Sequence, residues 1–468
     1  MDKFIDILKK NLDKNIWSDN KEEIEKYLIE PRGNFKGHSS LLLKPRNTNE
    51  VSKIVRFCNR YKLPLVPQGG RTGLTGGTMP SSKGNEILIS MEKMNKIISI
   101  DPDNFLMTVQ AGCVLTEIKK VSEKKNLYFP IKLASESRCT IGGNISTNAG
   151  GTSVLKYGMT RDLVAGIEVV LPNGDIINNL KALKKDNRAY DLKHLFIGAE
   201  GTLGIVTAAT IKLFPKVKDK AFCIVALKNI NLALKLLSLC NSKYKECLAT
   251  FELNSSIGFK LIKKHFSKIN MPFKKSYSWY VIIELTSSRF DDLENKLKLL
   301  LKKCIRESLI LDFIIPINNS HMKELWYTRE YLSEAQKIEG PSIKHDISIP
   351  ISKIPKFLIA AENLISKFIK KKHILVFGHL ADGNLHYNIS KPKNFKTNEF
   401  KKMYTKINSL VFELVHELGG SFSAEHGIGK IKIKELKKYS SKEELNLKKN
   451  IKFLIDPNKI MNPGKIFK

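Results

Sequence analysis

Hydrophobic and polar residues follow two different rhythms along the 468 residues. Between residues 38 and 216, short apolar runs such as LVPQGG, EILISM and LMTVQAG are separated by glycine-rich turns, a pattern that predicts β-strands. Residues 114–126 predict one helix among them. The dipeptide Asn173-Gly174 stands between two β-rich runs and predicts a type I′ hairpin turn. Together these elements predict an α+β domain.

The second half of the chain has longer helical patterns that alternate with strands, from residue 221 to about 420. Residues 231–244 and 289–308 are two of the helical patterns, and SYSWYVIIELT and HILVFGHL are two of the β-type runs. Residues 400–418 carry apolar side chains at steps of three and four and stop at Gly419-Gly420, which predicts an amphipathic helix with a glycine cap. A second α+β domain is therefore expected.

These rhythms divide the chain into four parts. We expect an N-terminal helical segment (1–36), two α+β domains (37–216 and 217–420) and a C-terminal segment (421–468). The first part interleaves acids and lysines with apolar residues at helical spacing, unlike a secretory signal peptide. No apolar run approaches the roughly 18 residues of a transmembrane helix.

Cysteine usage indicates a reducing compartment. The seven cysteines are scattered and form no CxxC pair, so neither a disulfide framework nor a cysteine-based zinc site is expected. A cytoplasmic location fits this composition.

The net charge of +33 raises the question of a polyanionic partner. A protein that binds nucleic acid or an anionic membrane surface would gather its lysines on one face, and salt-sensitive binding would reveal it. Here the lysines are spread along the whole chain, and no RNP-like or zinc-finger pattern accompanies them. We therefore expect no nucleic-acid partner.

Three loops rich in glycine and small polar residues lie within the first domain, at residues 64–80, 139–158 and 195–207. Such loops let backbone N–H groups approach an anion without obstruction by Cβ atoms. They lack the GxGxxG of a dinucleotide-binding βαβ unit and the GxxxxGK[ST] of nucleotide hydrolases, which disfavours NAD and ATP. Three such loops could enclose a long ligand with a pyrophosphate and a heteroaromatic ring.

The loops PLVPQGGRTGLTGG, TIGGNISTNAGG and FIGAEGTLGI resemble the FAD-binding (PCMH-type) domain of the vanillyl-alcohol-oxidase flavoprotein family. GHLADGNLH, SAEHGIGK and MNPGKIF resemble the C-terminal half of the same enzymes, so the resemblance covers nearly the whole chain. It is closest to the FAD-linked D-2-hydroxyglutarate dehydrogenases, in a group with D-lactate and glycolate dehydrogenases. It implies an FAD-binding domain at 37–216, a substrate and metal-binding cap domain at 217–420, and a C-terminal segment that returns to the flavin.

The resemblance also implies which residues hold FAD. Gly69 to Gly73 would hold the pyrophosphate, the second loop would line the ribityl chain and ring, and the third loop with Asn462 would approach the isoalloxazine. No histidine lies between residues 38 and 194, so we expect non-covalent FAD. The implied cofactor residues are Pro67, Gly69, Gly70, Arg71, Thr72, Gly73, Gly143, Asn144, Thr147, Asn148, Gly150, Glu200, Gly204, Ile205 and Asn462.

Two histidines in FGHLADGNLHYNIS suggest a metal site. If Leu380 pairs with Leu385 across a four-residue turn, His379 lies directly opposite His386, with Cβ atoms about 5 Å apart. Two imidazoles at that distance can share a divalent metal such as zinc or manganese, or they can form a purely structural cross-strand pair. The resemblance favours the metal and implies His379, His386 and Glu425 as its ligands.

Glu425 and its neighbour His426 belong to SFSAEHGIGK, after the helix that follows the hairpin. On an extended backbone His426 would point away from the metal and would act as a base. The segment 325–350 resembles the family's substrate segment and implies Arg329 and Lys344 as carboxylate partners. It also implies Ser333 as a hydroxyl donor to the substrate, at a position where hydroxyglutarate enzymes have threonine. Asn388 would share the face of the two histidines and contact the substrate.

These residues together predict FAD-dependent, metal-assisted oxidation of a D-2-hydroxy acid to the 2-oxo acid. The resemblance implies D-2-hydroxyglutarate as the expected substrate, with D-lactate or glycolate as the alternative. The enzyme would need an electron acceptor other than NAD, such as an electron-transfer flavoprotein, a quinone or a cytochrome. A homodimer and a role as the flavin subunit of a larger complex are left open by the sequence.

Overall fold

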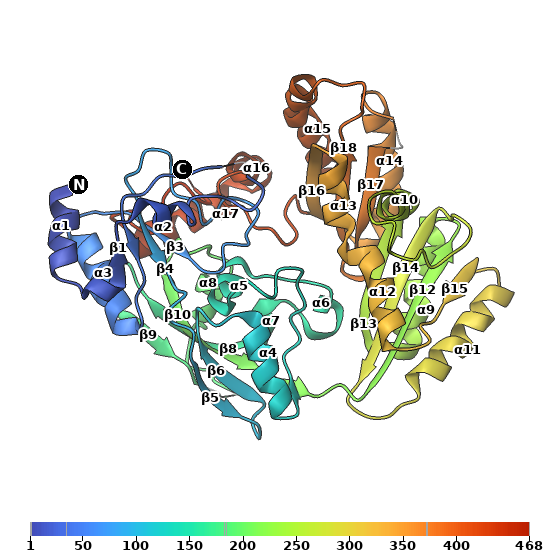
Figure 1. The fold of residues 1–468 in the computed structure, drawn as a ribbon, viewed down its shortest axis with the longest axis horizontal. Helices are drawn as coiled ribbons and strands as arrows, with labels where there is room; N and C mark the ends of the chain where they lie inside the picture. Colours follow the sequence, from blue (N-terminus) through green and yellow to red (C-terminus); the bar gives the residue numbers. More distant parts are fainter. Residues whose placement is uncertain (1, 34, 182, 184, 371–372, 468) are drawn as a thin grey trace. The chain divides into compact units, whose positions relative to one another are not determined.

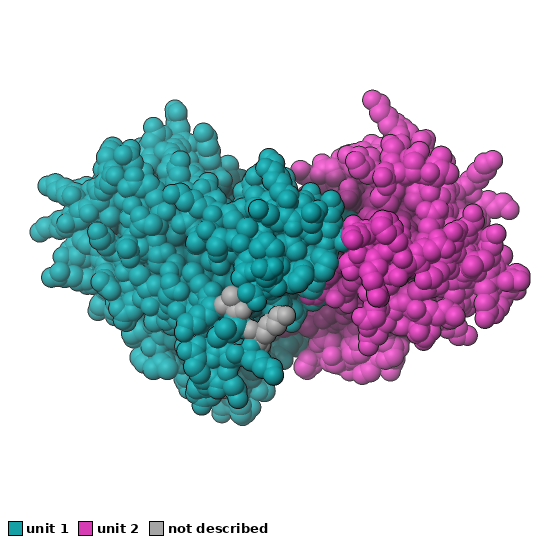
Figure 2. Space-filling model, turned by 90° about the horizontal axis from the view of Figure 1, so that it is seen from below, with its two compact units in different colours: residues 1–151, 158–216, 425–468 teal, residues 152–157, 217–424 magenta. Residues whose placement is uncertain are grey.

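The computed structural model describes residues 2–33, 35–181, 183, 185–370 and 373–467 (Figure 1). They form two compact units, coloured separately in Figure 2. Unit 1 comprises residues 1–151, 158–216 and 425–468, and unit 2 comprises residues 152–157 and 217–424. This division differs from the four expected parts: the N-terminal segment 1–36 belongs to unit 1, residues 152–157 belong to unit 2, and the chain returns to unit 1 after residue 424 and not after 420. Met1 and Asn34 of the N-terminal segment lie outside the described residues.

Unit 1 contains two main sheets. A four-stranded sheet has the order β1-β2-β4-β3, in which β2, β4 and β3 are parallel, and a five-stranded antiparallel sheet has the order β5-β6-β10-β8-β9. The strands are β1 (Trp17–Ser18), β2 (Leu42–Leu43), β3 (Leu65–Gln68), β4 (Ile87–Ser90), β5 (Ile97–Asp101), β6 (Leu106–Gln110), β8 (Val164–Val170), β9 (Ile176–Asn179) and β10 (Ile205–Lys212), with a separate pair β7 (Leu127–Tyr128) and β11 (Phe214–Pro215).

The helices of unit 1 come from the first domain and from both terminal segments of the chain. Ile5 and Leu8 of the first helix are buried in one apolar cluster with Leu41 and Leu43, so the N-terminal segment packs as part of this unit. The helices are α1 (Asp2–Lys10), η1 (Lys14–Ile16), α2 (Lys21–Glu25), α3 (Thr48–Arg60), α4 (Leu115–Lys124), α5 (Ile141–Thr147), α7 (Thr160–Leu163), α8 (Lys193–Phe196), α16 (Ile433–Tyr439) and α17 (Lys442–Ile455).

The hairpin between β8 and β9 is confirmed, but its type I′ turn is wrong. Only Gly174 has a positive φ (85°) in this turn, and its N–H donates to the Leu171 carbonyl at 2.8 Å. Pro172 fixes its own φ near −65°, which suits the second position of a type I turn, and it lacks the N–H that a two-residue turn at Asn173-Gly174 would need from the residue before it. The turn therefore closes with a single left-handed glycine, as in three-residue hairpin loops.

Unit 2 is built on a seven-stranded antiparallel sheet of order β15-β12-β14-β13-β17-β18-β16 (Figure 1). The strands are β12 (Asp219–Leu227), β13 (Leu248–Ser255), β14 (Trp279–Ser287), β15 (Asp312–Ile314), β16 (Ser342–Ser348), β17 (Ile374–His379) and β18 (Asn384–Ser390). The helices are α6 (Val154–Tyr157), α9 (Ile230–Tyr244), α10 (Ser256–His265), α11 (Leu293–Arg306), α12 (Asn319–Glu330), α13 (Leu332–Glu339), η2 (Ile351–Lys353), α14 (Ile354–Ser366), η4 (Leu380–Asp382) and α15 (Thr397–Glu417).

One face of this sheet is apolar at one end and polar at the other. Under α10 and α12, Phe222, Ile224, Tyr280 and Ile282 form a buried apolar cluster with residues of these helices. Strand alternation continues the same face to Glu252 on β13, which stands opposite Ile282. The predicted helix 400–418 is confirmed as α15, which ends before Gly419, a residue with a φ of 73°.

The prediction that the seven cysteines form no disulfide is confirmed, because all are unbonded. None of the helices in the described ranges combines the length and the apolarity that a membrane span requires.

Asp456 holds the turn that returns the chain to the parallel sheet of unit 1. Its buried carboxylate accepts hydrogen bonds from the N–H groups of Ile460 (3.0 Å) and Met461 (2.9 Å) and forms an ion pair with Lys452. Met461 then forms a parallel bridge to Leu65 of β3. The Asp456 carboxylate thus holds Met461 in its contact with Leu65, which lies far away in the sequence.

We expect Asp456→Ala to lower the free energy of unfolding of unit 1 by roughly 3 kcal/mol, because it removes the buried charge partner of Lys452 and the acceptor of two backbone amides. Glu444→Ala on the same helix is the matched control, since its ion pair with Lys448 is exposed and worth less than about 0.5 kcal/mol. Urea unfolding followed by circular dichroism compares the two. Equal losses would show that Asp456 is not a structural anchor.

Candidate active site

Unit 1 contains a cavity walled by loops that are far apart in sequence. Its lining comes from within residues 67–78, 140–147 and 200–206, together with Met91, Ala111 and, from the C-terminal segment, His426. Eight of the predicted cofactor residues line it: Pro67, Gly69, Gly73, Gly143, Thr147, Glu200, Gly204 and Ile205. The three glycine-rich loops therefore do converge on one cavity.

The other seven predicted cofactor residues lie outside the lining described for unit 1, and some of them shape its walls. A Cβ on Gly70 would come within 2.0 Å of the Arg138 carbonyl oxygen, so glycine is required there by packing. Asn148 ends α5 in the left-handed region and accepts a hydrogen bond from the Arg161 N–H. The full set is Gly70, Arg71, Thr72, Asn144, Asn148, Gly150 and Asn462. Direct contact of these residues with a cofactor stays a prediction.

The cavity offers a ligand both open space and polar groups. A Cβ built on Gly73 would meet nothing within 4 Å, so the first loop leaves open space beside its backbone. Two lining residues also offer buried polar atoms, Gln68 Oε1 and Thr140 Oγ1, which have no hydrogen-bond partner in the described part of the chain. Unpartnered buried polar groups cost free energy unless a ligand or water satisfies them. These features fit FAD.

Glu200 holds the loop that carries His426. Its carboxylate accepts hydrogen bonds from the N–H groups of Ile428 (2.7 Å) and Gly429 (2.8 Å). Burial raises the pKa of Glu200, and these two backbone hydrogen bonds act in the opposite direction. Asn462 completes the arrangement, because its side-chain amide donates to the carbonyls of Glu200 (2.7 Å) and Gly77 (2.9 Å). Both residues therefore act on the protein backbone.

In unit 2, the expected pairing of His379 directly opposite His386 is wrong. His386 stands opposite Phe377, so the register differs by two residues from the predicted one. Beyond Phe377 the strands separate, because β17 continues along β13 while β18 continues along β16. A shift of two keeps both histidines on one face of the sheet, with their ring centroids 6.3 Å apart.

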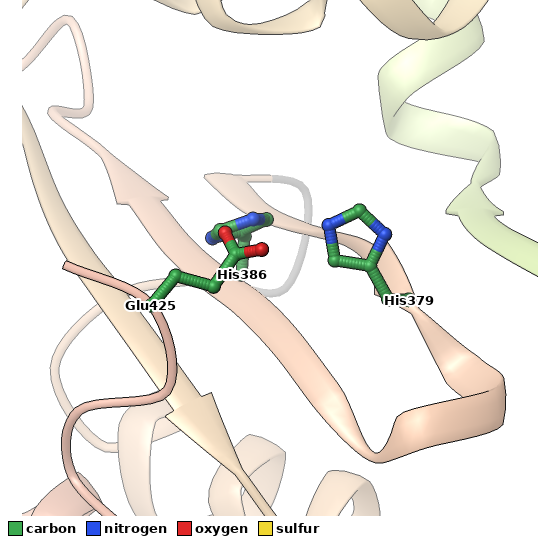
Figure 3. A group of neighbouring side chains, drawn as sticks. All are labelled: His379, His386 and Glu425. Carbon is green, nitrogen blue, oxygen red and sulfur yellow. The ribbon is translucent and has the colours of Figure 1, made fainter. Parts of the chain in front are cut away.

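His379, His386 and Glu425 form a group that could hold a metal ion (Figure 3). Each offers one ligand atom, and these atoms lie within 4.8 Å of one another. Glu425 follows Ala424, whose N–H donates to the Asp346 carbonyl of β16 at 3.3 Å. Ligands of a tetrahedral zinc stand roughly 3.3 Å apart, so small side-chain rotations would close the group around an ion. Two imidazoles and a carboxylate fit a divalent metal with a position left for substrate.

Glu252 is a buried carboxylate that the sequence did not single out. It stands opposite His379 on the neighbouring strand, accepts a hydrogen bond from His379 Nδ1, and pairs with Arg329 Nε at 2.6 Å. Burial alone would raise the pKa of Glu252, but the charges and hydrogen bonds of His379 and Arg329 outweigh it and lower the pKa to about 2. Glu252 is therefore ionised at neutral pH.

The predicted substrate residues lie on three elements of unit 2. Arg329 is on α12, the exposed Ser333 on α13, and Lys344 on β16 opposite Asn388 of β18. The Asn388 side chain is buried, donates to Gln336 Oε1 (2.9 Å) and accepts from the His345 N–H (3.2 Å). Substrate contacts for all four stay predictions.

His426 does not turn away from the predicted ligands. One of its ring nitrogens lies within 4.8 Å of ligand atoms of Glu425 and Asp346. These three residues form a second group that could hold a metal ion. The expectation assumed an extended backbone, in which neighbours alternate, but the chain bends through residues 424–426. Asp346 was missed although it stands opposite His386, because a cross-strand partner 40 residues away leaves no local sequence signal.

Two family models match the chain. "FAD linked oxidases, C-terminal domain" matches residues 216–466, and "FAD binding domain" matches residues 39–179. The chain is 36% identical to D-2-hydroxyglutarate dehydrogenase of Stutzerimonas stutzeri over 430 residues, 92% of this chain and 91% of that protein. It is 36% identical to the mitochondrial D-2-hydroxyglutarate dehydrogenase of Arabidopsis thaliana over 454 residues, 97% of this chain and 79% of the relative.

Solved structures share the fold. p-Cresol methylhydroxylase aligns with a TM-score of 0.75 at 16% identity, over 99% of this chain and 96% of its own. Alkyldihydroxyacetonephosphate synthase aligns with a TM-score of 0.74 at 18% identity, over 99% and 84%. These likenesses agree with the predicted α+β architecture of the vanillyl-alcohol-oxidase type. With one family model covering more than half of its residues and relatives above 30% identity along nearly its full length, the chain belongs to the FAD-linked oxidases and is an FAD-dependent oxidoreductase.

Proposed function

We propose that this protein oxidises D-2-hydroxyglutarate to 2-oxoglutarate, with non-covalent FAD and a divalent metal, most suitably zinc. One short segment carries the proposal: Glu425 belongs to the candidate metal group, and the next residue, His426, lines the cavity of unit 1. The relatives named D-2-hydroxyglutarate dehydrogenase support the substrate. They do not favour the D-lactate or glycolate alternative.

The reaction removes a proton from the substrate hydroxyl and a hydride equivalent from its carbon. When bound, FAD would supply the two-electron acceptor and the metal would supply a Lewis acid that lowers the pKa of the hydroxyl. His379, His386 and Glu425 would hold the metal, and His426 would accept the hydroxyl proton. Glu200 keeps the His426 loop in place through its two backbone hydrogen bonds.

The substrate carboxylates would be bound by Arg329 and Lys344, with Ser333 and Asn388 as hydrogen-bond partners. Arg329 presents five N–H donors in a planar fork, and the contact with Glu252 uses Nε. Arginine is the residue type suited to bidentate carboxylate binding, whereas Lys344 supplies a point charge.

Two further assignments belong to this proposal. Reoxidation of the flavin needs an acceptor such as an electron-transfer flavoprotein, a quinone or a cytochrome. The unbonded cysteines support a reducing compartment such as the cytoplasm, although the plant relative is named a mitochondrial enzyme.

We expect about one zinc per chain in the wild-type protein, and its loss in His386→Ala, because only one imidazole of the group then remains. FAD, released by acid and quantified by absorbance, should stay near one per chain in both. His416→Ala, at an exposed position on α15, should keep its zinc and serves as the control. Full zinc content in His386→Ala, or chelation without effect on turnover, would make the histidine pair structural.

His426→Ala should retain zinc and FAD but slow flavin reduction by roughly 10²–10⁴-fold, the usual effect of removing a general base. Stopped-flow absorbance of the flavin under anaerobic conditions measures this step without an electron acceptor. Exogenous imidazole should restore part of the rate. A variant with wild-type flavin reduction would exclude His426 as the base.

The wild-type enzyme should have a higher kcat/KM for D-2-hydroxyglutarate than for D-lactate. If Arg329 binds the distal carboxylate, Arg329→Ala should reduce that preference by about 30-fold, because a lost charge pair costs roughly 2 kcal/mol. Equal losses for both substrates would assign Arg329 to the shared carboxylate. The measurement is turnover of D- and L-2-hydroxy acids with an artificial acceptor, with Arg306→Ala as an exposed control. Faster turnover of D-lactate, glycolate or an L-enantiomer would contradict the proposed function.

A further inference from the structure

Glu252 divides its two carboxylate oxygens between two residues with different proposed tasks. Oε1 accepts from His379 Nδ1, and Oε2 accepts from Arg329 Nε at 2.6 Å. His379 comes from β17 and Arg329 from α12, so one side chain joins a candidate metal ligand to a candidate carboxylate-binding residue.

The position of Glu252 makes its orientation well defined. Its side chain is 1% exposed, and strand pairing places it directly opposite His379 on the same face of the sheet. A buried carboxylate is costly unless both oxygens find strong donors. Here each oxygen has one strong donor. Turning the carboxylate toward either His379 or Arg329 would take the acceptor away from the other residue.

The contact to His379 determines which ring nitrogen is available to a metal. A proton on Nδ1 donates to Glu252, which leaves the lone pair of the neutral ring on Nε2. Figure 3 shows one ring nitrogen of His379 turned toward His386 and Glu425 and the other turned away from them. A carboxylate behind a ligating histidine fixes its tautomer and raises its basicity.

The contact to Arg329 likewise holds that side chain in one orientation. Glu252 takes Nε on one edge of the guanidinium, and the ring of Phe377 lies 4.9 Å from its Cζ. Its side chain retains 13% exposure. The two Nη groups are the remaining donors of the fork, so they are oriented by the contact that Glu252 makes.

We propose that Glu252 is a positioning residue that orients the metal ligand His379 and the carboxylate-binding Arg329 together, so that metal affinity and dicarboxylate preference depend on one buried side chain. This inference rests on the proposed metal site and substrate.

The first test measures zinc affinity in the full-length protein. Wild type, Glu252→Gln and Glu284→Gln are stripped with a chelator, checked for FAD content and melting temperature, and titrated with Zn²⁺ against a chromophoric chelator. Glutamine keeps the size of Glu252 but cannot accept from His379 and Arg329 at once. Glu284 is a matched control, since it is a largely buried carboxylate on the same sheet face, opposite Thr250, and pairs with Lys220.

Zinc should bind Glu252→Gln about 10–100-fold more weakly than wild type, the usual effect of removing a partner of a ligating histidine. Glu284→Gln should stay within about 3-fold, and only Glu252→Gln should change the visible spectrum of bound Co²⁺. If Glu252→Gln does not fold, Glu252→Asp keeps the charge but is too short to reach both partners, and should weaken zinc in the same direction. If the folded Glu252 variant binds zinc as tightly as wild type, or if both glutamine variants lose the same affinity, the role of Glu252 is wrong but the metal site stands. If the wild-type protein binds no zinc, both the metal site and the role of Glu252 are wrong.

A second test addresses Arg329 at saturating zinc. Glu252→Gln and Arg329→Gln should each lower the ratio of kcat/KM for D-2-hydroxyglutarate to that for D-lactate, and the double variant should be within about 3-fold of Arg329→Gln, because both changes act through one guanidinium. Multiplicative losses in the double variant would show that Glu252 does not act through Arg329.

Discussion

Antiparallel pairing of β13, β17, β18 and β16 is the constraint on which the chemistry of unit 2 depends. Side chains alternate between faces with a period of two, so the registers Glu252 to His379, Phe377 to His386 and His386 to Asp346 place one glutamate, two histidines and one aspartate on the same side of the sheet. A slip of one residue in any pair would move its polar group into the apolar layer on the opposite face. Helices α10 and α12 pack against the apolar part of this face, which lies on β12 and β14.

In both units, buried carboxylates hold together segments that are far apart in the sequence. Glu200 holds the backbone of residues 428–429, 228 residues further along the chain, and Glu252 holds the side chains of His379 and Arg329 from two different elements. Asp456 fixes the turn that reaches β3. In each case several strong donors offset the cost of burying the charge, so the carboxylate contributes a fixed geometry more than net stability.

The sequence was a good guide wherever the signal is local. Periodicity located α4 and α15, glycine and small polar residues located the loops that line the cavity, and family motifs located His379, His386 and Glu425. It failed where the determinant is a partner distant in sequence. The hairpin register depends on how β17 and β18 pair with β13 and β16, and Glu252 and Asp346 owe their roles to strands that no single-sequence pattern pairs. Pro172 is the exception, because it is a local signal, and it favours a type I turn over the type I′ turn that Asn173-Gly174 suggests.

Unit 1 is built from three separate segments of the chain, so it cannot be completed on the ribosome until the last of them has been synthesised. Leu65 of β3 is hydrogen-bonded to Ile460, so the parallel sheet acquires that contact only after residues 217–424 have been synthesised. Unit 2, most of which is one continuous stretch, can fold earlier because its contacts are closer in sequence. The wall that carries His426 is the last part of the cavity to be synthesised, so a nascent chain cannot complete the cavity before its C-terminal segment emerges.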